Sequence, residues 1–456
     1  MQREALSGET LHGDKPDAPT FIAPEIDALF SEHVDPNWRG RITEPDLFEQ
    51  IEDVPEEAFA VARRSMKERM IARLRQRLLD RQSEIYSRSE IGRHLDAILD
   101  PETLTIGFAR RFATYKRATL LLRDRDRARR LFSDPERPLQ LVLAGKAHPK
   151  DAAGKEFIAE IVRFSREEGF EDRILFVEDY DIGIARSIVQ GCDVWLNTPR
   201  RPMEASGTSG MKAALNGTIN LSILDGWFPE AYDGSNGWAI GDTREFIDTV
   251  YQDEIESRSL YDLLELEVLP SFYESGRGAP SSSWIARQKR TIASMAGEFS
   301  SDRMVQDYVN LLYRPAITRF TTLDAESGTG ARNLDAWISH LQSVWSDISF
   351  ASVTMSPDRT EVQRGESIDI DIEITLGRVA PENVLVQGLI GPVSSTEEVE
   401  DGRIVTLTHT GSTDGTASYS GTIEVAETGR QGITLRVVPA ATSLIDPVDV
   451  GLVTWS

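Results

Sequence analysis

The segment 203–217, MEASGTSGMKAALNG, combines residue types that could hold a phosphate group. It is rich in Gly, Ser and Thr, and it lies between an apolar run and a stretch of helical composition. Small residues at the start of a helix leave backbone N–H groups free for an anion and allow it to approach closely. Glu204 precedes the predicted helix and Lys212 lies just inside it. The pattern favours a phosphate cradle beside a lysine, or else a glycine-rich turn that binds nothing.

A second segment, GFARRFATYKR at 107–117, places cations at the end of another apolar run: Arg110, Arg111, Lys116 and Arg117. Arginine offers forked hydrogen bonds to a phosphate, and lysine offers a point charge. The same residues could instead form a solvated basic helix start, or pair with acidic surface groups. Because both segments follow strands of one predicted sheet, an anion site at a shared edge is favoured. The segment around Lys212 does not fit a nucleotide P-loop, because no Ser or Thr follows the lysine.

The composition narrows the possible partners. The chain has 456 residues, with 74 Asp and Glu against 50 Lys and Arg, and a net charge of −24. Such a charge repels nucleic acids and anionic membranes, so neither is expected as a partner.

Only eight of the 50 cations are lysines, and a retained lysine can mark a need for an amine that loses its proton. Four lie in suggestive places: Lys116, Lys146, Lys150 and Lys212.

The cysteine count and the apolar runs indicate a compartment. Cys192 is the single cysteine, which excludes an internal disulfide framework and fits a reducing environment. Residues 1–20 have no apolar core of the kind found in signal peptides. No stretch approaches the roughly 20 apolar residues of a membrane helix. We therefore expect a cytoplasmic protein. His148 and Cys192 have no assignable catalytic role and are expected to be packing or surface residues.

Short apolar runs alternate with helix-length stretches in the middle of the chain, which is typical of a parallel sheet covered on both faces. The runs are TLTIGFA (103–109), LQLVLAG (139–145), RILFVED (173–179), DVWLNTP (193–199) and TINLSIL (218–224). The predicted helices between them cover 115–132, 152–168, 182–191 and 207–216. The pattern predicts a doubly wound, Rossmann-like α/β lobe that binds its ligand beyond the carboxyl ends of the strands.

Three domains are expected. Residues 1–100 form a divergent N-terminal segment and a helical lead-in, in which 56–82 is a long amphipathic helix. Residues 101–345 form the Rossmann-like lobe with its closing helices, packed by Trp284, Tyr308, Tyr313 and Trp337, with a break near 327–332. Residues 346–456 alternate in polarity at 367–376, 404–410 and 432–438, which predicts a small antiparallel β-sandwich.

Several blocks of the chain resemble successive blocks of the α-glucan (glycogen, starch and maltodextrin) phosphorylases. The blocks are GFARRFATYKRATLL, LVLAGKAHPKD, FVEDYDIGIA, DVWLNTPRRPMEASGTSGMKAALNG and GWAIGD, in the family's order and spacing. The resemblance implies a lobe of a two-lobed glycosyltransferase fold, specifically the C-terminal, cofactor-binding half. It also implies a retaining glycosyltransferase that acts in glycogen catabolism. Such an enzyme uses inorganic phosphate to release α-D-glucose 1-phosphate from α-1,4-glucan ends.

The resemblance also assigns the cofactor and its neighbours. Pyridoxal 5′-phosphate would be joined to Lys212 as a Schiff base, and its 5′-phosphate would relay a proton to or from the substrate phosphate. Arg110 takes the place of a family lysine near the cofactor phosphate. Thr208 and Ser209 would contact that phosphate, and Tyr180 would pack beside the cofactor.

The substrate would meet a separate set of residues. By the same resemblance, Arg111 and Lys116 would hold the substrate phosphate. Glu204, Ser206 and Gly207 would hydrogen-bond the glucose hydroxyls. The implied catalytic set is therefore Lys212, Arg111, Lys116 and Glu204, and the cationic members would act mainly by electrostatic preorganisation.

Two departures from the family pattern bear on activity. Asp181 lies where some members have an arginine, which would remove one cofactor contact. The similarity begins near 18–26, and the family's Thr-Asn-Gly at the lobe junction is not recognisable in 12–21. A single lobe would leave the site open to water, which such sites exclude. We therefore expect a fragment, or a chain that pairs with a separately encoded N-terminal lobe; a homodimer is also expected from the family.

Two alternatives stay open. A sugar-nucleotide glycosyltransferase lobe has a similar sheet and a glutamate near its donor, but it needs no lysine at the position of Lys212. A truncated, non-catalytic cofactor- or glucan-binding protein would keep the fold without turnover. The C-terminal domain has few aromatic residues for stacking on sugars, namely Phe350, Tyr419 and Trp455, so packing or assembly is its expected role.

Overall fold

The computed structural model describes residues 21–456 except 45, 83–97, 279, 358–361, 394–398, 400–401, 414, 426–427, 442 and 445. The chain divides into two compact units, Met1–Gln306 and Asp307–Ser456.

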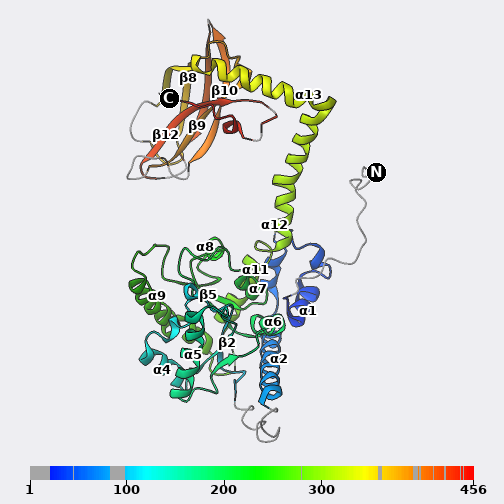
Figure 1. Cartoon of the computed structure of the whole chain (residues 1–456), viewed down its shortest axis with the longest axis vertical. Coiled ribbons are helices and arrows are strands. Elements are labelled where there is room, and N and C mark those ends of the chain that lie inside the picture. The colour runs from blue at the N-terminus through cyan, green and yellow to red at the C-terminus, as the bar shows by residue number, and fades with distance from the viewer. Residues whose placement is uncertain are drawn as a thin grey trace. The chain divides into compact units, whose positions relative to one another are not determined.

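The first unit is built around a parallel sheet of six strands (Figure 1). The strands are β1 (Leu104–Ala109), β2 (Leu139–Ala144), β3 (Ile174–Val177), β4 (Val194–Asn197), β5 (Ile219–Ile223) and β6 (Gly237–Ile240). They lie in the order β3-β2-β1-β4-β5-β6, which is that of doubly wound sheets. This order confirms the predicted α/β fold. It also places β1 directly beside β4, with Ile106 opposite Val194.

The helices of this unit are α1 (Pro24–Leu29), α2 (Glu56–Gln82), α4 (Arg125–Ser133), α5 (Ala152–Glu167), α6 (Ile182–Gly191), α7 (Thr208–Ala214), α8 (Phe228–Ala231), α9 (Thr249–Leu263), α10 (Leu269–Tyr273), α11 (Ser282–Met295) and α12 (Ser301–Asp307). The long helix predicted over 56–82 is confirmed with the same bounds.

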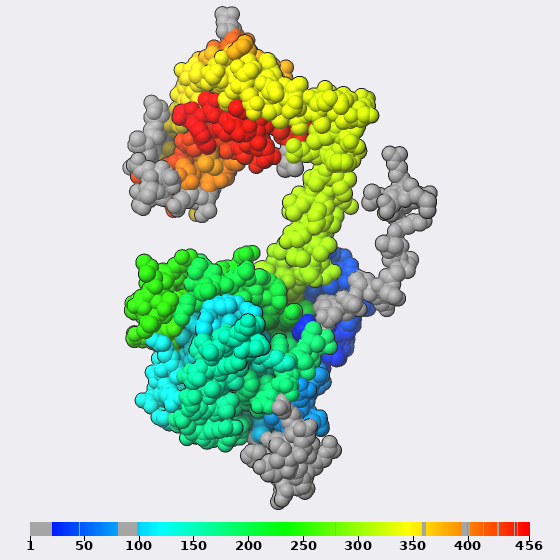
Figure 2. All heavy atoms as spheres, in the orientation of Figure 1, coloured from blue at the N-terminus to red at the C-terminus, as the bar shows by residue number. Residues whose placement is uncertain are grey.

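Two cores lie on opposite faces of the sheet, because successive strand residues point to opposite sides. Leu141 and Leu143 of β2 join the core that contains α4, α5 and α9 residues. Val142 and Ala144 join the core that contains residues of α2 and α6. Figure 2 shows the cyan and green atoms of the first unit as one continuous surface.

One predicted helix was wrong in its start. The stretch expected to be helical over 115–132 begins with two short 3-10 turns, Thr114–Lys116 and Leu120–Leu122, and α4 starts only at Arg125. Arg117 has a left-handed backbone, with φ of 43°, which interrupts a helix. Asp124 then caps α4, since its side chain accepts from the Arg127 N–H at 2.9 Å.

The second unit contains α13 (Arg314–Val344) and an antiparallel sheet. The strands are β7 (Ser349–Ser356), β8 (Ser367–Thr375), β9 (Val384–Pro392), β10 (Arg403–Thr413), β11 (Thr416–Glu424), β12 (Gln431–Pro439) and β13 (Thr454–Trp455). Their continuous order is β13-β12-β9-β10-β11-β8-β7, and the sheet curls around its core. The predicted antiparallel β domain is confirmed.

The helix that leads into this sheet is packed differently from the expectation. Its backbone leaves the helical range from Ala325 to Gly328, near the predicted break. Tyr308 and Tyr313, expected to be packing residues, are 44% and 56% exposed, because they lie on a helical stretch with no buried residue. Trp284 is buried as expected, and Trp337 packs against the β-domain core.

Candidate active site

Glu204 lies at the centre of a charged cluster at the carboxyl edge of the parallel sheet. It belongs to the loop that joins β4 to α7, whereas its two cationic neighbours follow β1. Lys116 Nζ lies 2.9 Å from Glu204 Oε2 and 3.1 Å from Oε1. Arg110 Nη1 lies 3.4 Å from Oε2. Because β1 and β4 are neighbours, residues that follow them meet at this edge, as the sequence predicted.

Arg110 is buried and incompletely paired. Only 8% of its side chain is exposed, and its Nε and Nη1 have no hydrogen-bond acceptor among the described residues. The 3.4 Å approach to Glu204 is thus an ion pair without hydrogen-bond geometry. Burial lowers the pKa of Arg110, and the Glu204 carboxylate opposes that change. Buried N–H groups without acceptors are rare, so these donors fit an anionic ligand such as a phosphate.

The position of Glu204 is set by the turn after β5. Its backbone N–H donates to Asp225 Oδ2 at 2.9 Å. Gly226 has φ of 62°, and a Cβ there would lie 2.3 Å from the Ser206 carbonyl oxygen. The Trp227 N–H donates to the same carbonyl at 3.0 Å. Sequence reasoning missed Asp225, although its place directly after the apolar run 218–224 was a usable signal.

Helix α7 carries the lysine that the sequence singled out. Gly207 precedes it with φ of 91°, a conformation that favours glycine. Lys212 Nζ lies 3.5 Å from Thr208 Oγ1, one helical turn back, and 4.5 Å from the ring centre of Phe21. Ser209 Oγ accepts from Trp195 Nε1 at 3.3 Å. Lys212 is half-buried, and Thr208 is exposed.

A cavity of about 380 Å³ lies beside Lys212. Its lining is mostly apolar, with a few hydroxyl groups: Phe21, Ile42, Phe48, Thr208, Met211, Lys212, Leu215, Met295, Ala296, Phe299, Ser300, Ser301 and Asp302. The Phe21 carbonyl is held by Asn216 Nδ2 at 2.9 Å and by Gln190 Nε2 at 3.1 Å. An apolar pocket with one amine and nearby hydroxyls fits a flat, ring-sized cofactor attached to that amine.

Two neighbouring positions, Tyr180 and Asp181, bear on the implied cofactor contacts. Burial raises the pKa of the half-buried Tyr180, and the positive charge of Arg110 opposes this rise. Asp181 caps α6, since its side chain accepts from the Ile184 N–H at 2.8 Å. That hydrogen bond lowers the pKa of Asp181 and gives the carboxylate a structural role.

Arg111 is exposed, and its side chain has no ion pair with any described residue.

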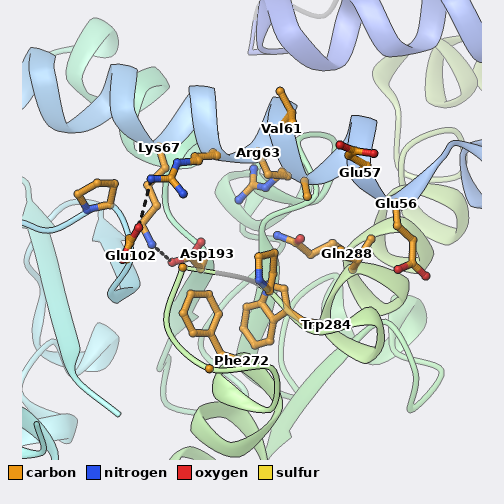
Figure 3. A pocket seen from close by; sticks show the side chains of 17 residues that line it. Glu56, Glu57, Val61, Arg63, Lys67, Glu102, Asp193, Phe272, Trp284 and Gln288 are labelled. Atoms are coloured by element: carbon orange, nitrogen blue, oxygen red, sulfur yellow. Dashed lines mark hydrogen bonds and ion pairs between the residues drawn. The ribbon is translucent and has the colours of Figure 1, made fainter. Parts of the chain in front are cut away.

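Of the other lysines, Lys146 and Lys150 are exposed, whereas Lys67 is buried at the opposite edge of the sheet. Lys67 Nζ lies 2.6 Å from Asp193 Oδ2 and donates to the Thr103 carbonyl at 2.6 Å. Figure 3 shows this pair among the side chains that line a second cavity, of about 450 Å³, at the amino ends of β1 and β4. The presence of a lysine at position 67 is therefore explained by this structural ion pair and not by a chemical role.

The two residues expected to have no catalytic role are placed accordingly. Cys192 is fully buried, and His148 is exposed, with Nδ1 accepting from the Lys150 N–H at 3.2 Å.

Within the described part of the chain, no His, Cys, Asp and Glu side chains gather in a way that could hold a metal ion. Nor does that part contain a helix long and apolar enough to span a membrane.

The fold and the site together define a doubly wound α/β protein with a cluster of charged side chains at the carboxyl edge of its sheet and a lysine beside an apolar pocket. Comparison with known sequences gives the family. The family described as carbohydrate phosphorylase matches residues 21–266, and the glycogen phosphorylase C-terminal domain matches 345–456. The chain belongs to the carbohydrate phosphorylase family.

Several relatives support this membership. The glycogen phosphorylase of Mycobacterium tuberculosis is 38% identical over 445 residues, which cover 96% of this chain and 50% of the relative. The maltodextrin phosphorylase of Thermococcus litoralis is 36% identical over 393 residues, covering 86% and 45%. The glycogen phosphorylase of Aquifex aeolicus is 41% identical over 296 residues, covering 65% and 42%. This chain therefore spans about half the length of the curated relatives it matches.

Proposed function

We propose that the chain is the cofactor-bearing half of an α-1,4-glucan phosphorylase. Such an enzyme transfers a terminal glucose of glycogen or maltodextrin to inorganic phosphate and releases α-D-glucose 1-phosphate. The relatives with these names are about twice as long as this chain. We therefore propose that activity also needs the part of these relatives that this chain does not cover. The homodimer and the cytoplasmic location expected from the sequence also stay predictions.

The observation that carries the proposal is the buried guanidinium of Arg110, whose Nε and Nη1 have no hydrogen-bond acceptor among the described residues, at the sheet edge that also bears Lys212. We assign Lys212 as the attachment point of pyridoxal phosphate. Arg110 would face the cofactor phosphate, together with the hydroxyls of Thr208 and Ser209, and Tyr180 would pack beside the ring. When bound, the cofactor supplies a phosphate group that can take up and return a proton.

Lys116 and Glu204 would bind the substrates while remaining paired with each other. An ammonium group has three donors, and a carboxylate has about four lone-pair sites, so neither group is saturated by their mutual contact. Lys116 would hold the substrate phosphate, and Glu204 would accept from the glucose hydroxyls, next to Ser206 and Gly207. Arg111, which is exposed and unpaired among described residues, would complete the phosphate site from the open side. Fixed charges of this kind stabilise the transition state by preorganisation.

The second candidate is the non-catalytic alternative. In that case the chain would bind the cofactor or a glucan without turnover. Family membership leaves the sugar-nucleotide glycosyltransferase alternative without support.

A phosphorolysis assay separates these candidates. The chain, loaded with pyridoxal phosphate, is given maltoheptaose and phosphate, alone and together with the N-terminal half of the Mycobacterium tuberculosis relative. We expect glucose 1-phosphate only from the mixture, and none when the chain carries Lys212→Arg. The matched control is Lys155→Arg, an exposed lysine on α5 that should leave the rate unchanged. A stable, cofactor-loaded complex of both halves without release would contradict phosphorylase activity, and release by the chain alone would contradict the need for a second lobe.

A further inference from the structure

Two carboxylates on α9 face two arginines that belong to the loops of the candidate active site. Asp253 and Glu256 are three residues apart in the helix, so they lie on one face. Arg117 directly follows Lys116 in the loop after β1. Arg200 lies four residues before Glu204 in the loop after β4.

Asp253 binds both arginines at once. Arg117 Nη1 donates to Asp253 Oδ1 at 2.9 Å. Arg200 Nη2 lies 2.9 Å from the same oxygen and donates to Oδ2 at 3.0 Å. Glu256 forms a further ion pair with Arg117, and both side chains of that pair are almost fully buried. The carboxylate of Asp253 therefore contacts both loops from α9, beside the hydrogen bonds that Arg200 Nη1 donates to the Thr249 carbonyl and to Gln252 Oε1.

The arginines in turn join the two loops directly. Arg117 Nε donates to the Thr198 carbonyl at 3.0 Å, and its Nη2 donates to the Pro199 carbonyl at 2.6 Å. The Thr198 hydroxyl donates to the Lys116 carbonyl at 3.0 Å. The Arg200 N–H donates to the Tyr115 carbonyl at 2.7 Å. Lys116 thus lies between two residues whose positions depend on the second loop.

The backbone of Arg117 shows that this arrangement is imposed by its surroundings. Its φ of 43° is in the left-handed range, which is unfavourable for a residue with a side chain. Such conformations persist only where nearby contacts determine them, and they gather at functional sites. Every nitrogen of the Arg117 guanidinium donates a hydrogen bond, to Asp253, Thr198 or Pro199. The contacts of its side chain therefore hold the turn that presents Lys116.

We propose that Asp253 is a positioning residue of the active site: through Arg117 and Arg200 it holds Lys116 in place against Glu204. The proposal rests on the proposed function, because only the proposed function assigns substrates to Lys116 and Glu204. Asp253 contacts neither member of that pair in the structure, so it acts through the arginines. A purely structural role in α9 would not single out these two loops.

Hydrogen exchange tests the positioning without any need for activity. In the full chain, Asp253→Asn removes the charge that both arginines share and keeps the size of the side chain. We expect exchange in segments 113–118 and 198–206 to rise by about tenfold, because local contacts set local opening. The matched control is Asp262→Asn on the same helix, which pairs with Arg127 at 2.7 Å and is 51% exposed. Unchanged exchange in both segments, or an equal rise throughout the sheet, would overturn the proposal.

Kinetics of the two assembled halves give the second readout. For Asp253→Asn we expect kcat to fall by about 100-fold with little change in the KM for maltoheptaose, because small misplacements of catalytic groups act mainly on the rate. Asp253→Glu, which keeps the charge, should recover part of the rate and of the exchange protection. A rise in KM with kcat unchanged would contradict a positioning role for Asp253. So would a failure of Asp253→Glu to recover any of the rate. If the wild-type halves show no turnover, the proposed function fails, whereas the exchange result still decides whether Asp253 holds the loops.

Discussion

At the scale of single residues, burial separates side chains that look equivalent in the sequence. Arg110 and Arg111 are adjacent, but Arg110 is 8% exposed beside Glu204 whereas Arg111 is open to solvent. Successive residues at the end of a strand point in opposite directions, which produces this difference. The sequence predicted a cationic cluster, but it could not tell which arginine would be enclosed and left with unpaired donors.

Cys192 gives a prediction at this scale. Burial raises the pKa of its thiol from an ordinary 9.0 to about 12, and the nearby Arg63 charge opposes the rise. Since thiolate is the reactive form, we expect almost no reaction with a thiol reagent at pH 8 in the native protein. Unfolding in denaturant should expose one fully reactive thiol. Rapid labelling of the native chain would contradict this placement.

The same shift has a consequence for stability. The folded-state pKa of Cys192 lies above the unfolded value, so its contribution to stability is complete below about pH 9 and is lost as the pH rises toward 12. Tyr273 acts in the same direction, because burial raises its pKa to about 12 while its hydroxyl donates to the Pro138 carbonyl at 2.6 Å. Both groups therefore favour the folded protein at neutral pH and oppose it in strong alkali.

At the scale of elements, the strongest patterns were predicted well. The long helix had the predicted bounds, and each of the five apolar runs contains a strand. The helix expected over 115–132 was wrong in its start, because two 3-10 turns, the left-handed backbone of Arg117 and the Asp124 cap delay the helix until Arg125. The strand β6 was not predicted, although it has four residues, the same length as β3 and β4, which were predicted.

Helix α2 is fastened to the sheet by a buried ion pair, which can be tested. Lys67→Met would leave Asp193 without its cation in a site where the Lys67 side chain is only 4% exposed. Breaking a buried pair from one side costs about 3–5 kcal/mol, so we expect a loss of that size in the free energy of unfolding in urea. Arg64→Met is the control, because its pair with Glu68 is half-exposed and contributes less than about 1 kcal/mol. Equal stability of the two variants would show that the pair does not fasten the helix.

At the scale of the whole molecule, the sequence predicted an α/β lobe followed along the chain by an antiparallel β domain, and both folds are present. The expected domain limits at 100/101 and 345/346 stay predictions. The β-domain core includes Leu341, Val344 and Trp345, which precede its first strand. A local pattern of polarity cannot show such packing, because the contacts join segments far apart in the chain.

The central claim is that this half-length chain suffices to bind pyridoxal phosphate, since Lys212, Arg110 and the adjoining cavity all lie within the first unit. The most direct measurement is to incubate the purified chain with the cofactor, reduce it with borohydride and map the labelled peptide by mass spectrometry. We predict one label, on Lys212, that is absent in Lys212→Arg and kept in Lys155→Arg. A label spread over exposed lysines, or no label at all, would contradict the account.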